Sequence, residues 1–381
     1  SSAGGTNRLY SVEPTLSITG SNADHRLRLS AQDVARYARA LAAELASTGV
    51  ELGQLSGAVR GTSTEGIPEQ WLKAVARDLL QNRGQSLIVV GPRQPAALHA
   101  LAHALNRALG NAGNTVTYTE PVDPQEPENF DSLKNLAAVI EAGRVDTLLI
   151  LGGNPALDAP ADLKFGEALK KIPTTVHFTS HLDETASLTT WQVPRAHELE
   201  SWGDQQSLRG DYSVQQPLIA PLWGGRTDAE VLAIVAAEPS WRAYNLVQAT
   251  VEKRGFRGEL AWRRLLHTGI ADTRFGAVLG TAPLRDAEIA AAVRKLGTAG
   301  PLAENTYEAV FTVDNKLYDG RYANNTWLLE LPDPITRITW DNAALFAPST
   351  AKKLGIKNGD MVRITRGDAS VDIVAWLQPG V

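Results

Sequence analysis

The sequence predicts an α/β fold with parallel sheets, followed by a small β domain. Between about residues 86 and 194, short apolar runs alternate with stretches of helical spacing, and the connections are short. This alternation is typical of parallel strands joined by right-handed crossovers, as in Rossmann-like doubly wound sheets. From about residue 308 the runs become β-type. A chain of 381 residues is long enough for about two or three domains.

The first third of the chain predicts helices with two intervening strands. Pro68 and Pro95 stand where proline opens a helix, and Gly110 stands where glycine ends one. The segment before residue 131 is rich in proline and acidic residues, which favours a linker or domain seam. The predicted elements are helices over 31–48, 68–80 and 95–109, strands over 86–91 and 115–119, and a linker over 120–131.

The middle of the chain gives the clearest strand–helix–strand pattern. It predicts helices over 131–142 and 162–171 and strands over 146–151, 174–180 and 191–194. Two further helices are predicted over 227–237 and 259–268.

The C-terminal part predicts the start of a small β-barrel. Its β-type runs cover 307–313, 326–331, 361–367 and 370–377, with a turn at 357–360. We therefore expect four domains: an α/β domain over 1–130, a Rossmann-like domain over 131–240, a partly helical connection over 241–307 and a truncated β domain over 308–381.

Composition excludes several classes of function. The net charge is −5 without long blocks of like charge, so nucleic acid is not an expected partner. No apolar run approaches the ~20 residues that cross a bilayer. The absence of cysteine excludes disulfides, thiolate zinc sites, cysteine-ligated iron–sulfur clusters and a cysteine nucleophile within these residues.

The first candidate site is the Gly-Gly-Asn-Pro turn formed by Gly152, Gly153, Asn154 and Pro155. Glycines at the carboxyl end of a strand allow backbone N–H groups to approach a phosphate or ribose. The GxGxxG and GxxxxGK[ST] patterns are absent, so a structural turn is the favoured interpretation. Binding of a nucleotide remains the alternative.

Other polar groups are weaker candidates. Asp183 and Glu184 follow a predicted strand and could contact a ligand at the sheet edge, although capping of a helix is the simpler role. His99 and His103 share one helix face, as a metal pair would require, but the sequence offers no third ligand nearby. The acidic cluster 197–204 lacks the HExxH spacing of zinc enzymes.

Several segments, in order, resemble the molybdopterin oxidoreductase family. The resemblance covers a strand ending in Gly-x-Asn-Pro, a second strand leading to Glu-Thr-Ala, a Pro…Glu-x-x-Gly segment and a Leu-Gly-Ile…Gly-Asp entry to a C-terminal β domain. These matches lie in 141–155, 165–186, 193–204, 213–236 and 342–365. The segments 7–27, 94–116 and 318–345 are more specifically similar to the hybrid molybdopterin-like and iron–sulfur subunit, the B subunit, of alternative complex III.

This resemblance implies an oxidoreductase subunit of a respiratory chain. It implies other subunits of a membrane-bound complex as partners, export by the twin-arginine route and a place on the periplasmic side of the cytoplasmic membrane. Iron–sulfur clusters are expected only in a part of the subunit outside this chain. Residues 1–130 then correspond to the second domain of the family fold.

The chain departs from the family where the cofactor would bind. Many relatives carry an aspartate on the second strand that recognises guanine, whereas this chain has Phe178, Thr179 and Ser180 there and no acid before Asp183. No metal-ligand segment can be matched. We therefore expect a fold retained as a scaffold, with no catalytic residue, no metal and no cofactor in these residues. The alternative is a domain that still binds molybdopterin guanine dinucleotide at Gly152, Asn154 and Asp183.

Overall fold

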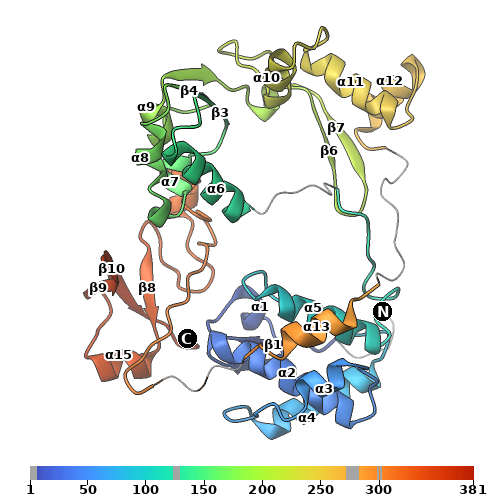
Figure 1. Ribbon diagram of the computed structural model, residues 1–381, viewed down its shortest axis with the longest axis vertical. Helices are drawn as coiled ribbons and strands as arrows, with labels where there is room; N and C mark the ends of the chain where they lie inside the picture. The colour runs from blue at the N-terminus through green and yellow to red at the C-terminus, as the bar shows by residue number, and fades with distance from the viewer. Residues whose placement is uncertain (1–6, 123–128, 272–282, 298–299, 301–302) are drawn as a thin grey trace. The chain divides into compact units, whose positions relative to one another are not determined.

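The computed structural model describes residues 7–122, 129–271, 283–297, 300 and 303–381, and the chain forms two compact units (Figure 1). Unit 1 contains Ser1–Tyr118, Leu279–Tyr318 and Tyr322–Val381, and unit 2 contains Thr119–Val278 and Asp319–Arg321. This division is coarser than the four predicted domains, whose boundaries stay predictions. No helix of the described residues is long and apolar enough to span a membrane.

Unit 1 is built around a helical core. Leu45, Leu101, Leu105 and Val293 are fully buried or nearly so within it. Its helices are α2 (Ala31–Ser47), α3 (Leu55–Val59), α4 (Glu69–Gln81), α5 (Ala96–Ala108) and α13 (Asp286–Val293), beside a short parallel pair of β1 (Tyr10–Glu13) and β2 (His25–Arg28) and the single-turn helix α1 (Ile18–Ser21). The three helices predicted in this region are confirmed by α2, α4 and α5.

The predicted strands over 86–91 and 115–119 are not formed. The backbone N–H of Ile88 donates to the side-chain oxygen of Asn106, and the Asn106 amide donates to the Ile88 carbonyl, at 3.0 and 2.8 Å. The buried amide therefore takes the place of a neighbouring strand, which the apolar run could not reveal. Residues 115–119 contribute an isolated bridge between Ala112 and Val116.

The C-terminal part of unit 1 forms an open sheet. Strands β8 (Ala343–Phe346), β10 (Ala369–Leu377) and β9 (Met361–Arg366) lie in that order, with α15 (Pro348–Leu354) between β8 and β9. Among the described residues this sheet does not close, so the expected barrel is not confirmed. The run 326–331 was expected to be a strand but forms helix α14 (Thr326–Glu330), because the Asn325 side chain caps it by accepting from Leu328 N.

Unit 2 contains the predicted parallel sheet. Strands β3 (Thr147–Leu151), β4 (Thr174–Thr179) and β5 (Trp191–Pro194) are parallel neighbours in sequence order. Helices α6 (Asn129–Glu141), α7 (Pro155–Asp158), α8 (Phe165–Leu169) and α9 (Glu184–Leu188) connect or precede them. The described strands show no reversal of order, which is the feature that defines a doubly wound sheet. The confirmed fold class is mixed α/β with parallel sheets.

One face of this sheet packs on helices. Leu148 and Ile150 of β3 contact a core that includes Ile140 of α6 and Phe165 and Leu169 of α8. The helix predicted over 162–171 is interrupted after the 3-10 turn Ala161–Leu163, because Lys164 adopts a left-handed φ of 46°.

The rest of unit 2 is a hairpin packed on helices. Strands β6 (Gly203–Gln206) and β7 (Tyr212–Gln215) are antiparallel, and α10 (Asp228–Val235), α11 (Ala243–Lys253) and α12 (Glu259–Thr268) follow. The hairpin was not predicted; the helices over 227–237 and 259–268 are confirmed. A core of Tyr212, Val251 and Trp262 joins strands and helices.

Candidate functional site

The candidate site lies where β3, β4 and β5 end. Because parallel strands place their carboxyl ends at one edge, the segments that follow them are brought together. Gly152 to Asn154 follow β3, Asp183 and Glu184 follow β4, and Arg195 follows β5. The structure therefore assembles the residues predicted from sequence, together with three that were missed: His177, Thr185 and Arg195.

Asn154 links the turn after β3 to helix α9. Its Oδ1 accepts from the backbone N–H and the hydroxyl of Thr185, at 3.1 and 2.7 Å, and its Nδ2 donates to Glu184 Oε2 at 2.7 Å. The fully buried Thr185 hydroxyl also accepts from Ala156 N. The hydrogen bond from Asn154 holds the pKa of Glu184 below its ordinary value. Both ends of the Asn154 amide are thus engaged within the protein.

Asp183 is the N-cap of α9. Its Oδ1 accepts from Ala186 N at 2.8 Å, and its Oδ2 accepts from the Thr179 hydroxyl at 3.3 Å. The capping role, which the sequence favoured over ligand contact, is confirmed by this geometry.

His177 is a second fully buried polar residue of the site. It is 0% exposed, and its Nε2 lies 3.1 Å from the Gly153 carbonyl oxygen. Its Nδ1 lies 3.6 Å from Asp183 Oδ1, which is too long for a hydrogen bond, and has no partner among the described residues. A histidine inside an otherwise β-type run, in register with Ile150 of β3, was the available sequence signal.

Gly152 and Gly153 both have a φ of 72°, which favours glycine. The Gly152 N–H donates to Phe178 O at 2.9 Å, and a Cβ at Gly152 would stand 2.7 Å from Arg195 Nη1. The close neighbour of Gly152 is therefore the Arg195 guanidinium. Around Gly153, no described atom lies within 4 Å of an added Cβ.

Arg195 is held in this position by Asp228, at the start of α10. The guanidinium donates through Nε and Nη2 to the two carboxylate oxygens, at 2.9 and 2.5 Å. Such a bidentate pair fixes the plane of the guanidinium, which lies beside the Gly152 backbone.

Pro155 opens α7, and Asp158 ends it. Burial, followed by the negative charge of Asp319, raises the pKa of Asp158 above its ordinary value. Its Oδ1 is buried and lacks a hydrogen-bond partner among the residues that the structure describes.

These contacts do not fit a dinucleotide at this edge. A phosphate needs free backbone N–H groups, but the Gly152 N–H belongs to the sheet and the Arg195 guanidinium covers its Cα. The side chains of Asn154 and Asp183 are occupied by Thr185, Glu184 and Ala186. A ligand placed against Gly152 would require Arg195 to move, whereas no described atom lies within 4 Å of an added Cβ at Gly153.

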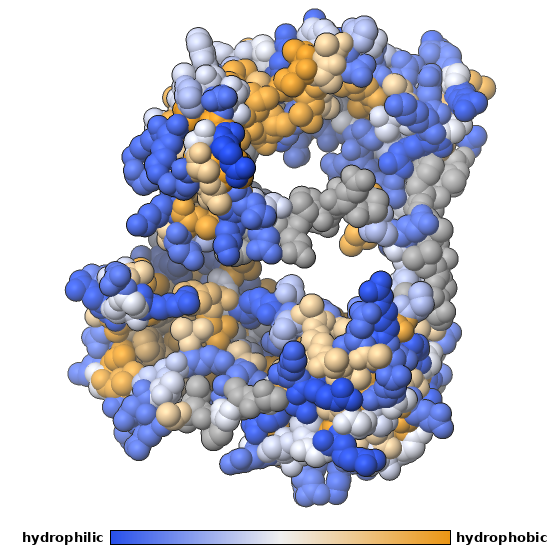
Figure 2. Space-filling model, viewed as in Figure 1, coloured by the Kyte–Doolittle hydropathy of each residue, from blue (hydrophilic) through white to orange (hydrophobic). Residues whose placement is uncertain are grey.

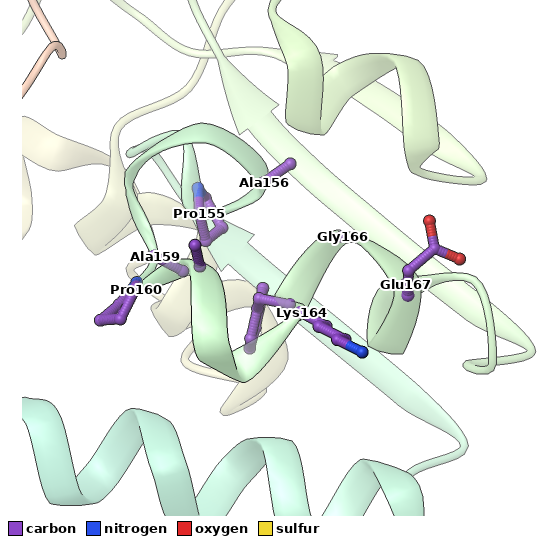
Figure 3. Close-up of a pocket in the computed structure, with 9 residues that line it drawn as sticks. Pro155, Ala156, Ala159, Pro160, Lys164, Gly166 and Glu167 are labelled. Carbon is purple, nitrogen blue, oxygen red and sulfur yellow. The ribbon is translucent and has the colours of Figure 1, made fainter. Parts of the chain in front are cut away.

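A hollow of about 250 Å³ lies beside this edge, between α7 and α8 (Figure 3). Prolines and alanines form most of its lining, and its charged lining residues are Lys164 and Glu167. Glu167 is paired with Lys170 at 2.8 Å and has no role in the hollow. The hollow lacks the convergent polar groups of a ligand site.

Two of the other sequence candidates, His103 and His197, have structural partners. His103 Nδ1 lies 3.1 Å from the Tyr118 hydroxyl, and His197 caps the 3-10 turn Glu198–Glu200 in a capping box with Glu200. In the part of the chain that the structure describes, no group of three or more His, Cys, Asp or Glu residues could hold a metal ion.

Comparison with known proteins gives one sequence relative and a shared fold. No family model matches the chain. Over 198 residues it is 27% identical to the menaquinone reductase, molybdopterin-binding-like subunit of Nitratidesulfovibrio vulgaris strain Hildenborough, a match that covers 49% of this chain and 27% of the relative.

Among solved structures, acetylene hydratase from Pelobacter acetylenicus superposes with a TM-score of 0.63 at 12% identity. The match covers 98% of this chain and 65% of that one, so the chain spans less than two thirds of either protein. The sequence relative and the shared fold together support the predicted resemblance to the molybdopterin oxidoreductase family.

Proposed function

We propose that this chain is a scaffold domain of a respiratory quinol:electron acceptor oxidoreductase subunit, of the kind found in alternative complex III, and that these residues bind no cofactor. Its role is to hold an iron–sulfur module and neighbouring subunits in register, because electron transfer between clusters requires short, fixed separations. The proposed partners are other subunits of a membrane-bound complex. The proposed location is the periplasmic side of the cytoplasmic membrane, after export by the twin-arginine route.

The occupied glycine turn supports this proposal. In the family the turn lies where a pterin dinucleotide would bind, but here the Arg195–Asp228 pair covers Gly152. Asn154 and Asp183 use their polar atoms to fasten α9. The groups that could bind a cofactor therefore stabilise the fold instead. The name of the sequence relative, a molybdopterin-binding-like subunit of a menaquinone reductase, agrees with a quinone-linked complex.

The alternative is a domain of an active enzyme that binds molybdopterin guanine dinucleotide at the same edge. It requires Arg195 to swing away from Gly152, which would free the Asp228 carboxylate. Asp228 could then accept hydrogen bonds from a guanine edge, because that edge presents a pair of N–H donors much as a guanidinium does.

Metal analysis and a guanine nucleotide titration of the complete subunit test the proposal. The scaffold role predicts neither molybdenum nor tungsten at stoichiometric level and no saturable binding of GMP or GDP. The titration is repeated on Arg195→Ala, in which Gly152 is uncovered. Stoichiometric metal in the native subunit, or tight nucleotide binding that Gly152→Val abolishes, would overturn the scaffold role in favour of the alternative.

A further inference from the structure

Unit 2 carries an apolar strip on its surface, formed by Leu218, Ile219, Leu222 and Trp223. Leu218 is 76%, Leu222 69% and Trp223 83% exposed. Leu218 N and Ile219 N both donate to Leu199 O, at 2.8 and 3.3 Å, so backbone hydrogen bonds hold the strip in place. A segment of seven residues from Pro217 to Trp223 contains no charged or polar side chain. Clustered exposure of this kind marks an interaction surface.

Helix α10, which follows the strip in the sequence, adds further exposed apolar side chains. Helix α10 buries Val231 and Ala233, but it also exposes Leu232, Ile234 and Val235. A helix that is apolar on all sides is normally covered on all sides. Figure 2 shows apolar side chains gathered over α10 and the strands beside it.

A stack of two arginines on a tryptophan adjoins the strip. The Arg242 and Arg226 guanidinium carbons lie 4.1 and 5.5 Å from the centre of the Trp241 ring. Arg226 is tied to the strip because its Nη1 donates to Gly224 O, directly after Trp223. Within the described ranges neither arginine has an ion pair with a carboxylate, whereas Arg195 nearby is neutralised by Asp228. The stack therefore leaves two positive charges beside an apolar surface.

We propose that the strip and the Arg226–Trp241–Arg242 stack form a docking surface for another subunit, whose contacting face is apolar and bordered by carboxylates. The proposal rests on the scaffold function and names the surface that performs it. Tryptophan and arginine beside an apolar centre are the residues that dominate protein–protein interfaces. The two guanidinium groups, which have no ion pair among the described residues, are complementary to acidic side chains on an opposing face.

Photo-crosslinking in the native complex tests the proposal. p-Benzoylphenylalanine replaces Trp223, cells that make the whole complex are irradiated, and the crosslinked peptide is identified by mass spectrometry. We expect a peptide of another subunit of the complex with apolar residues next to aspartate or glutamate. In the protein that carries p-benzoylphenylalanine in place of Trp223, the additional change Arg242→Glu should lower the crosslinking yield at least about tenfold. The change Arg257→Glu, on an exposed loop elsewhere in unit 2, should leave the yield unchanged.

A paired substitution tests the strip without a crosslinker. Leu222→Ser should weaken retention of this subunit in the purified complex, while Leu260→Ser, at a leucine of α12 that is even more exposed, should not. Both variants should melt like the native protein, since neither side chain is buried.

Three other results would overturn the docking surface. Sedimentation with phosphatidylglycerol vesicles that Leu222→Ser abolishes would assign the strip to a membrane. A homodimer that Leu222→Ser dissociates would assign it to a second copy. A normally assembled complex with crosslinks from Trp223 only within the same polypeptide would show that the chain itself covers this surface, and the scaffold function would stand. A native subunit that associates with no other subunit would overturn both proposals. A stoichiometric cofactor in the native subunit, found together with the expected crosslink, would overturn the scaffold function alone.

Discussion

Nε2 of the buried His177 lies 3.1 Å from the carbonyl oxygen of Gly153. Because a carbonyl oxygen can only accept, Nε2 is the donor in this contact, while Nδ1 has no hydrogen-bond partner among the described residues. The contact joins the centre of β4 to the turn after β3. It is therefore a structural tie across the candidate site.

Replacing His177 by leucine should destabilise unit 2. The change removes the hydrogen bond that the buried ring donates to the Gly153 carbonyl, and one such bond contributes about 0.5–1.5 kcal/mol. Urea denaturation should show this loss in the free energy of unfolding, and His267→Leu, at an exposed histidine of α12, should show almost none. A His177→Leu protein as stable as the native one would mean that the contact contributes nothing.

The two glycines of the turn should respond differently to substitution. Both have a left-handed φ, so alanine at either position is strained, at about 1 kcal/mol or more. Only at Gly152 would the new Cβ also meet Arg195. Gly152→Ala should therefore lower the melting temperature more than Gly153→Ala, and Gly152→Val more still.

A double-mutant cycle checks the origin of that difference. Arg195→Ala should recover part of the stability lost in Gly152→Ala, because the clash is removed, and should recover none in Gly153→Ala. Equal effects at the two glycines would contradict a specific contact with Arg195.

Asp158 should make stability fall as the pH rises. Burial and the charge of Asp319 raise its pKa in the folded protein above the ordinary value of 3.8. The folded state therefore binds the proton more tightly than the unfolded state, so this contribution is complete below pH 3.8 and declines as the pH rises through the folded pKa. Asp158→Asn should melt at a higher temperature than the native protein at pH 7, with the difference vanishing near pH 3. A lower melting temperature at pH 7 would show that the ionised carboxylate is stabilised by its surroundings.

Asn106 should be essential for the structure of residues 86–91, which were expected to form a strand. Its amide satisfies both backbone groups of Ile88 and also accepts from Asn111 Nδ2 at 3.0 Å. Asn106→Leu, which keeps the size of the side chain, should cost about 2–3 kcal/mol because several polar groups lose partners. Asn114→Leu, at an exposed asparagine with a hydrogen bond to Gly110 O, should cost less than about 1 kcal/mol. Faster hydrogen exchange at Ile88 would locate the effect.

Much of the secondary structure could be predicted because its signals are local. Proline at the start of α5, the apolar spacing of α2 and the continuous apolar run of β3 each act within a few residues. The Asp183 cap of α9 is equally local. The Asn325 cap of α14 was also present in the sequence, but the β-type residues that follow it concealed the helix.

The sequence by itself determined that β3, β4 and β5 are parallel and that the segments after them, with Asn154, Asp183 and Glu184, lie at one edge, because strand–helix–strand connections join parallel strands. Only the tertiary structure decided what that edge contains. Arg195 covers Gly152, and the amide of Asn106 replaces a strand beside Ile88. Each of these depends on which side chain, distant in the chain, fills a particular space and satisfies a particular polar group, and no periodicity or cap within one element specifies that choice.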